Sequence, residues 1–213
     1  MIFTQFYSYK NGEKKIEETT LWKINILHPG KPELFTAGNQ YYGASISPQL
    51  DKICYSKGTG ISNPIYLFDV KTNQTTTIMT TDFFYVQLAW SPDASWLAFV
   101  AADKKSGQLD LYCLYRYDLK SGRVNRIETS KYEKWNKDPS ISKDNKMIVF
   151  TNIKDNFPLI ATNLQNKQTK VLSAPKDSAI YHPEYSPDGN KIAYILHSRY
   201  SNTGQKAAIL YLK

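Results

Sequence analysis

The sequence has few cysteines, no long apolar segment and no stretch typical of a long helix. Only two of its 213 residues are cysteine, Cys54 and Cys113, and their spacing matches no metal-binding motif. No apolar run approaches the roughly 20 residues that span a bilayer, and no run rich in Ala, Leu and Glu indicates a helix. We therefore expect two buried thiols rather than a disulfide, no metal or other cofactor, and no transmembrane segment.

A signal peptide and a dense basic block are also absent from the sequence. The start, Met1-Ile2-Phe3-Thr4, has neither a charged nor an apolar leader region. A periplasmic or secreted location would therefore need a leader upstream of this sequence, and otherwise we expect the cytoplasm. The net charge is +8, but the basic residues are spread over many loops, which argues against nucleic-acid binding and leaves acidic partners open.

Aromatic residues are abundant in this chain. Apolar residues make up 41% of the sequence, which includes 16 Tyr, 9 Phe and 4 Trp. This content is sufficient to bury a core, and Tyr, Phe, Thr and Ile favour strands. The composition therefore predicts a folded, all-β protein.

A nine-residue stretch occurs four times. The copies are SPQLDKICY from Ser47, SPDASWLAF from Ser91, SKDNKMIVF from Ser142 and SPDGNKIAY from Ser186. In each copy a large apolar residue precedes the Ser, an aliphatic residue lies six positions after it, and an aromatic residue follows two positions later. The copies are 44, 51 and 44 residues apart, a period typical of propellers and solenoids.

Each full repeat is predicted to form four short strands. In the second repeat we expect strands at 86–90, 96–100, 111–117 and 124–127, with a tight turn at Ser91–Ala94. The first partial repeat begins at its second strand, and the last one lacks its fourth. We predict a single β-propeller domain over residues 1–213, with repeats at about 1–40 (partial), 41–81, 82–131, 132–175 and 176–213 (partial).

Two interpretations of the incomplete terminal repeats stay open. The chain closes as a five-bladed ring with incomplete terminal blades, or it is a fragment of a larger propeller. An open ring exposes unpaired strand edges, which favour association with other chains. The sequence leaves the oligomeric state undetermined.

The repeats resemble the TolB-type β-propeller family. SPDGNKIAY and SPDASWLAF, with LYCLYRYDLKSG and IYLFDVKTN, are similar to its repeat, and Trp90, Pro139 and Pro183 match its leading Trp and Pro positions. The resemblance implies four-stranded antiparallel blades. This family includes the TolB component of the bacterial Tol–Pal envelope system and the propellers of prolyl oligopeptidase relatives. The Gly-x-Ser-x-Gly motif of those hydrolases does not occur here, so their chemistry is not carried over.

Aspartates that recur at the same turn position are expected to be structural, because every repeat needs the same turn. One set follows the repeated Ser (Asp93, Asp144, Asp188), and the second set precedes the fourth strand (Asp69, Asp118, Asn163). Positions four residues before each Ser differ between repeats instead. They are Gly43, Gln87, Asp138 and His182.

The inner strand of a propeller blade lines the central channel, so these varying positions should converge at its mouth. The candidate site for a small polar ligand or cation comprises Gln87, Asp138, His182 and Glu184. His182 and Glu184 lie on the same side of a strand and, with Asp138, loosely suggest acid–base chemistry. The alternative is a hydrated channel without a ligand. We assign no catalytic residue.

Aromatic residues precede the inner strands and form a candidate rim for a partner peptide or a sugar. The rim residues are Tyr42, Tyr85, Trp135 and Tyr181. The alternative role is packing between blades. We predict a non-catalytic scaffold for a protein or peptide partner in a bacterial envelope context. The alternatives are an enzyme or carbohydrate-binding module that uses the channel mouth, or the propeller part of a larger hydrolase.

Overall fold

The computed structural model describes residues 2–11, 14–23, 30–36, 41–58, 63–79, 87–102, 112–198 and 205–212. The chain divides into two compact units, Met1–Leu88 and Ala89–Lys213, and each unit is described by itself. Five antiparallel sheets form the described part, and its helical content is the single turn of 3-10 helix at Ser130–Tyr132. The predicted all-β fold of four-stranded antiparallel sheets is confirmed.

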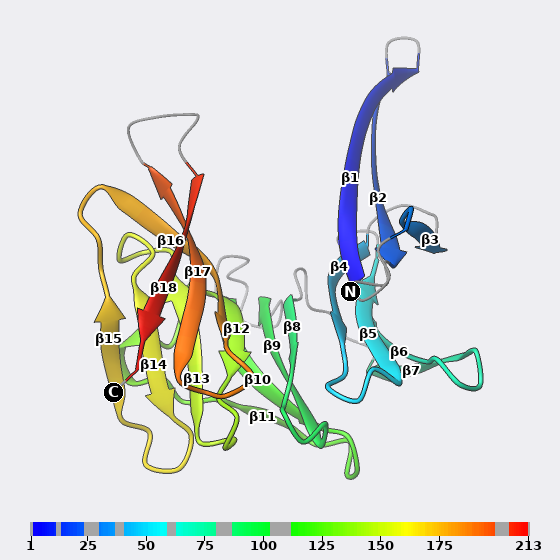
Figure 1. The fold of residues 1–213 in the computed structure, drawn as a ribbon. Coiled ribbons are helices and arrows are strands. Elements are labelled where there is room, and N and C mark those ends of the chain that lie inside the picture. Colours follow the sequence, from blue (N-terminus) through cyan, green and yellow to red (C-terminus); the bar gives the residue numbers. More distant parts are fainter. Residues whose placement is uncertain are drawn as a thin grey trace. The chain divides into compact units, whose positions relative to one another are not determined.

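The first unit contains two sheets (Figure 1). One has the order β1 (Ile2–Asn11), β2 (Lys14–Lys23), β3 (Glu33–Thr36), and the other has the order β4 (Tyr41–Ile46), β5 (Lys52–Lys57), β6 (Ile65–Asp69), β7 (Gln74–Met79). The β1–β2 hairpin pairs from Ile2↔Lys23 to Asn11↔Lys14 and is longer than the short strands expected there. The sequence contains a signal for this hairpin, because Gly12 follows the paired Asn11 directly and glycine is favoured at the first position of a two-residue hairpin loop.

The second unit contains three sheets in chain order, the first of which begins two residues before the unit boundary (Figure 1). That sheet comprises β8 (Gln87–Trp90), β9 (Trp96–Ala102), β10 (Tyr112–Asp118) and β11 (Val124–Arg126). The next comprises β12 (Asn136–Ile141), β13 (Met147–Asn152), β14 (Leu159–Asn163) and β15 (Thr169–Ser173). The last comprises β16 (Ser178–Tyr185), β17 (Lys191–Ser198) and β18 (Gln205–Tyr211).

The core of the second unit lies between consecutive sheets. Successive residues of a strand face opposite sides, and β13 uses both sides. Ile148 and Phe150 pack with Trp96 of the preceding sheet, whereas Val149 packs with Ile192 of the following sheet. The continuous apolar run of β13 therefore follows from burial on both faces. Cys54 and Cys113 are buried and no disulfide joins them, as expected.

The repeated stretch that begins at Ser47, Ser91, Ser142 and Ser186 forms the same turn in all four copies, which we call the serine turn. The fourth turn residue has a positive φ in each copy: Leu50 (59°), Ala94 (54°), Asn145 (59°) and Gly189 (80°). The backbone N–H of this residue donates to the Ser carbonyl at 2.8–2.9 Å. The Ser hydroxyl accepts a hydrogen bond from the N–H that begins the second strand, at 2.9–3.0 Å.

The predicted structural aspartates serve these turns and the later ones. Asp144 accepts a hydrogen bond from the Ser142 hydroxyl at 2.6 Å, which lowers the pKa of the Asp144 carboxyl. In the first copy, where Gln49 replaces the Asp, Asp51 accepts this hydrogen bond from Ser47. Before the fourth strands, the side chains of three residues accept hydrogen bonds from backbone N–H groups two or three positions later: Asp69, Asp118 and Asn163. Their structural role is confirmed.

Candidate functional site

Three of the four positions selected from the sequence lie at a β-bulge of their inner strand. Gly43, Asp138 and His182 all have left-handed backbone conformations, with φ of 56°, 51° and 49°. The pairing register shifts at each of these positions, between Tyr42 and Ser45 in β4 and at the equivalent points of β12 and β16. We call these positions strand-start bulges. A bulge turns a side chain out of the regular pleat and is common next to binding sites.

Asp138 and His182 are brought together in the second unit. The Asp138 side chain is 5% exposed, and its Oδ2 accepts a hydrogen bond from the His182 backbone N–H at 3.2 Å. Its Oδ1 lies 3.3 Å from His182 Nδ1, and the His182 side chain is 67% exposed. The hydrogen bond to Asp138 raises the pKa of His182, while partial burial and nearby Lys137 oppose this rise. Asp138 therefore fixes the imidazole and leaves it accessible to a ligand.

Glu184 and Ser140 lie on the same two strands as this pair, β16 and β12. The Ser140 hydroxyl is buried and accepts a hydrogen bond from the Tyr185 backbone N–H at 3.1 Å, which links β12 to β16. Burial raises the pKa of the Glu184 carboxyl, and a hydrogen bond with Ser140 opposes the rise. The Glu184 side chain is nevertheless exposed.

The predicted aromatic rim resolves into separate environments. The Tyr181 ring lies 4.7 Å from Phe157 and 6.4 Å from the His182 ring, so Tyr181 belongs to the candidate site. Trp135 instead contacts Tyr112, at 6.1 Å between centroids, and lines a pocket of about 330 Å³ with Tyr132, Asn152 and several lysines. The Tyr42 side chain and all of Tyr85 lie outside the described residues.

The candidate residue Gln87 is half-buried at the start of β8 and lies in the first unit, whereas Asp138, His182 and Glu184 lie in the second. The supported cluster, which we call the strand-start surface, consists of Asp138, Ser140, Tyr181, His182 and Glu184.

Sequence reasoning missed Ser140, Phe157 and the bulge itself. Ser140 accepts a hydrogen bond from the next inner strand, and this contact between two repeats has no sequence signal. A signal for the bulge did exist, because Gly43 occupies the equivalent position and glycine favours positive φ. The strand-start surface offers carboxylates, an imidazole and an aromatic ring. Among the described residues, no group of three or more His, Cys, Asp or Glu side chains could hold a metal ion.

The match to known proteins agrees with the repeated turn and the sheet order. Residues 42–203 match the PD40 family, the TolB β-propeller domain. The chain belongs to this TolB β-propeller family. In the described part of this TolB-type chain, no helix is both long and apolar enough to cross a membrane. A search of the curated proteins gave no match.

Solved structures share the fold of this TolB-type chain. TolB from Acinetobacter baumannii is 21% identical with a TM-score of 0.76, and the alignment covers 91% of this chain and 46% of that protein. A putative TolB from Agrobacterium tumefaciens is 16% identical with a TM-score of 0.72, covering 92% and 72%. The oligogalacturonate lyase of Vibrio parahaemolyticus is 13% identical with a TM-score of 0.64, covering 97% and 70%. This chain thus spans less than half of the first protein.

Proposed function

We propose that this TolB-type chain is a non-catalytic scaffold that binds a protein or peptide at the strand-start surface. The observation that carries the proposal is a repeated backbone with different side chains. Gly43, Asp138 and His182 share a left-handed bulge, yet they differ in size, charge and hydrogen-bonding groups. In the serine turn, by contrast, the residue whose side chain makes the repeated contact is the same Ser in all four copies.

The chemistry of the strand-start surface suits recognition. The His182 imidazole is exposed and held by Asp138, and the Glu184 carboxyl is partly desolvated, which strengthens its interaction with a donor or cation. The neighbouring Tyr181 ring adds apolar contact area, as aromatic residues do in interfaces. The bacterial envelope setting, and the expectation of no nucleic-acid ligand, remain predictions from the family resemblance and from the dispersed basic residues.

A random peptide library displayed on phage and selected on the purified chain tests the proposal. We expect selected peptides to bind with micromolar dissociation constants, measured by fluorescence anisotropy. His182→Ala and Glu184→Gln should each weaken binding about tenfold, equivalent to about 1.4 kcal/mol. Asp177→Asn is the matched control, because it removes one exposed negative charge just before β16 and should leave affinity unchanged. Equal affinity for all variants would place the binding surface elsewhere.

Acid–base catalysis is the second candidate function, and the Asp138–His182 pair favours it. A carboxylate that binds one imidazole nitrogen orients the ring for proton transfer at the other, as in catalytic triads. Under this alternative, a turnover reaction would be lost in His182→Ala and would follow the ionisation of His182. Peptide binding without any His182-dependent turnover of the bound peptide supports the scaffold instead.

A further inference from the structure

Three lysines line the cavity of about 330 Å³ beside Trp135, which we call the Trp135 pocket: Lys131, Lys134 and Lys154. Lys154 Nζ lies 5.5 Å from the centroid of the Trp135 ring, and Lys131 Nζ lies 4.9 Å from the centroid of the Tyr132 ring. Among the residues that the structure describes, none of the three ammonium groups forms an ion pair. Unpaired cations around one cavity create a positive potential that attracts anions.

Two acidic residues also line the Trp135 pocket, but they do not neutralise it. Glu133 Oε2 lies 3.3 Å from Nη2 of Arg126, which is outside the pocket lining. Asp155 is exposed on the loop between β13 and β14. Asp155 is therefore the one lining carboxylate that no ion pair occupies, against three ammonium groups, and the pocket favours an anionic group.

Two buried asparagines fix the loops that carry these residues. Asn152 Nδ2 donates hydrogen bonds to the Lys134 carbonyl at 2.7 Å and to Asn136 Oδ1 at 2.9 Å. Asn136 Nδ2 donates to the Tyr132 carbonyl at 2.7 Å. The other repeats have no asparagine at the equivalent positions, which are Lys57, Ala101 and Leu196 for Asn152, and Tyr41, Tyr85 and Ile180 for Asn136. The blade does not require this network, and its effect is to preorganise the Trp135 pocket.

Trp135 has two unfavourable features that the described part of the chain does not compensate. Its φ is 69°, which bulky side chains rarely adopt. Its indole Nε1 is buried and has no hydrogen-bond partner among the described residues. Folding alone does not account for a tryptophan here, and backbone strain of this kind is common where a ligand is held. Because the ring is only half-buried, a ligand in the pocket can contact it.

The Trp135 pocket lies beside the strand-start surface. Trp135 directly precedes β12, the strand that contains Asp138. The loop between β13 and β14 carries both Lys154 of the pocket and Phe157, whose ring lies 4.7 Å from Tyr181. Three residues of an extended chain span about 10 Å, so a peptide bound at the strand-start surface reaches the pocket within a few residues.

We propose that the Trp135 pocket binds an acidic side chain of the peptide that occupies the strand-start surface. The inference rests on the proposed peptide-binding function and adds the chemistry of the partner. The carboxylate of the peptide accepts charge-assisted hydrogen bonds from Lys134 and Lys154, and its methylene groups pack on the Trp135 ring. The pocket is at the small end of the range of ligand cavities, about 300–1,000 Å³, which suits a single side chain.

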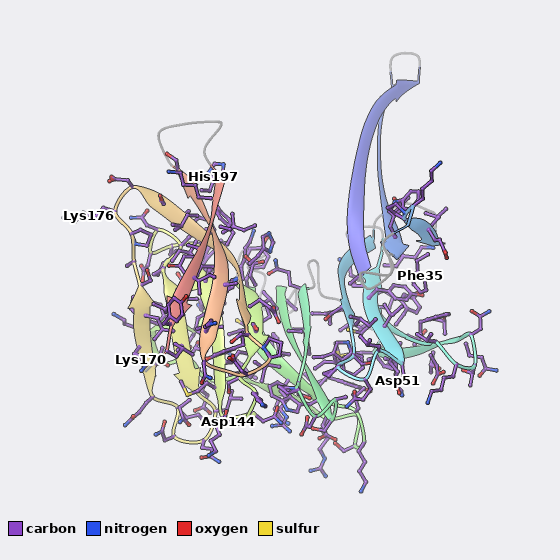
Figure 2. The ribbon with its side chains drawn as sticks, in the orientation of Figure 1. Phe35, Asp51, Asp144, Lys170, Lys176 and His197 are labelled. Carbon is purple, nitrogen blue, oxygen red and sulfur yellow. The ribbon has the colours of Figure 1, made fainter. Side chains whose placement is uncertain are left out.

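The phage-selected peptides test this inference by fluorescence anisotropy on the full chain. We expect each peptide to contain an acidic residue whose replacement by the corresponding amide weakens binding to the wild type about tenfold. The double variant Lys134→Gln/Lys154→Gln should bind the acidic peptide about tenfold more weakly than the wild type does, and should bind the acidic and amide peptides equally. The matched control is Lys170→Gln/Lys176→Gln, which removes two exposed lysines outside the pocket (Figure 2) and should keep the tenfold preference.

The outcomes separate this inference from the proposed function. If the wild type selects no peptide, both are overturned. If peptides bind and His182→Ala weakens them, but their amide versions bind equally well, only the pocket inference is overturned. An equal loss of preference in Lys170→Gln/Lys176→Gln would indicate general charge attraction and would also overturn it. A wild type without acidic preference, together with a lower melting temperature for Lys134→Gln/Lys154→Gln, would mean that a carboxylate of this chain fills the pocket.

Discussion

The serine turns and the strand-start bulges both repeat a left-handed backbone, but only the turns repeat their side-chain contacts. In every serine turn the same hydroxyl accepts a hydrogen bond from the first N–H of the second strand. At the bulges, Asp138 binds the next strand and His182 remains exposed, although both share one backbone conformation. Figure 2 shows Asp144 of a turn and His197, beside Tyr181, at opposite ends of the sheets.

This difference indicates which positions of a repeat protein are expected to carry function. A repeated backbone with repeated contacts is needed for folding in every blade. A repeated backbone with different side chains is free to specialise. Changes at the turns should therefore alter stability without altering binding, and changes at the bulges should alter binding with a smaller effect on stability.

The largest effect is expected at Ser142. Its hydroxyl is buried and accepts from the Met147 N–H at 2.9 Å while it donates to Asp144 at 2.6 Å. Ser142→Ala leaves a partly buried N–H without its acceptor and should lower the free energy of unfolding by about 1–3 kcal/mol. Urea denaturation measures the change. Ser121→Ala, at an exposed turn, is the control and should cost less, and an equal loss would contradict the structural role of the serine turn.

Gly189 should show the next largest effect. Its φ is 80°, and an added Cβ would meet Lys143 Cβ at 3.4 Å, which is ordinary contact, so strain comes from the backbone. Gly189→Ala should destabilise the protein by about 1 kcal/mol, with peptide binding unchanged. Gly30→Ala has open space around it and serves as the control in the same melting experiment. Identical melting temperatures for both variants would show that the positive φ of Gly189 does not disfavour alanine at this position.

Leu50 offers the opposite change at the equivalent turn position. Leu50 has a φ of 59° and is 65% exposed, so its side chain packs little and its backbone is strained. Leu50→Gly should therefore stabilise the protein by about 0.5 kcal/mol, the strain relieved less the entropy that glycine loses on folding. Thermal melts measure the shift. A lower melting temperature would mean that Leu50 packing outweighs the strain.

The sequence predicted the repeats, the strand order and the turns because these depend on local patterns. Three features of the repeat depend on contacts within a single blade. They are the Ser at position one, the aliphatic residue six positions later and the turn Asp. The strand-start surface was predicted only in part. Asp138, His182 and Glu184 were identified because they vary, but the hydrogen bond between Ser140 and the Tyr185 N–H joins two repeats, and no pattern within one repeat records it.

The smallest effect is expected from Asp138→Asn, and it depends on pH. Asp138 raises the pKa of His182 in the folded state. The resulting stabilisation is complete below the unfolded pKa of about 6.5 and is lost as the pH rises through the folded value. Because His182 is exposed, solvent screening keeps this contribution below about 1 kcal/mol.

The loss of stability in Asp138→Asn should therefore be larger at pH 5.5 than at pH 8.5, as measured by melting both proteins at each pH. The asparagine Oδ1 can still accept from the His182 N–H, so the variant isolates the charge from the backbone hydrogen bond. An NMR titration should also show a lower pKa for His182 in the variant. An unchanged pKa of His182 would mean that Asp138 acts only through its hydrogen bond with the His182 backbone N–H. The strand-start bulge would then have a structural role, as the serine turn does.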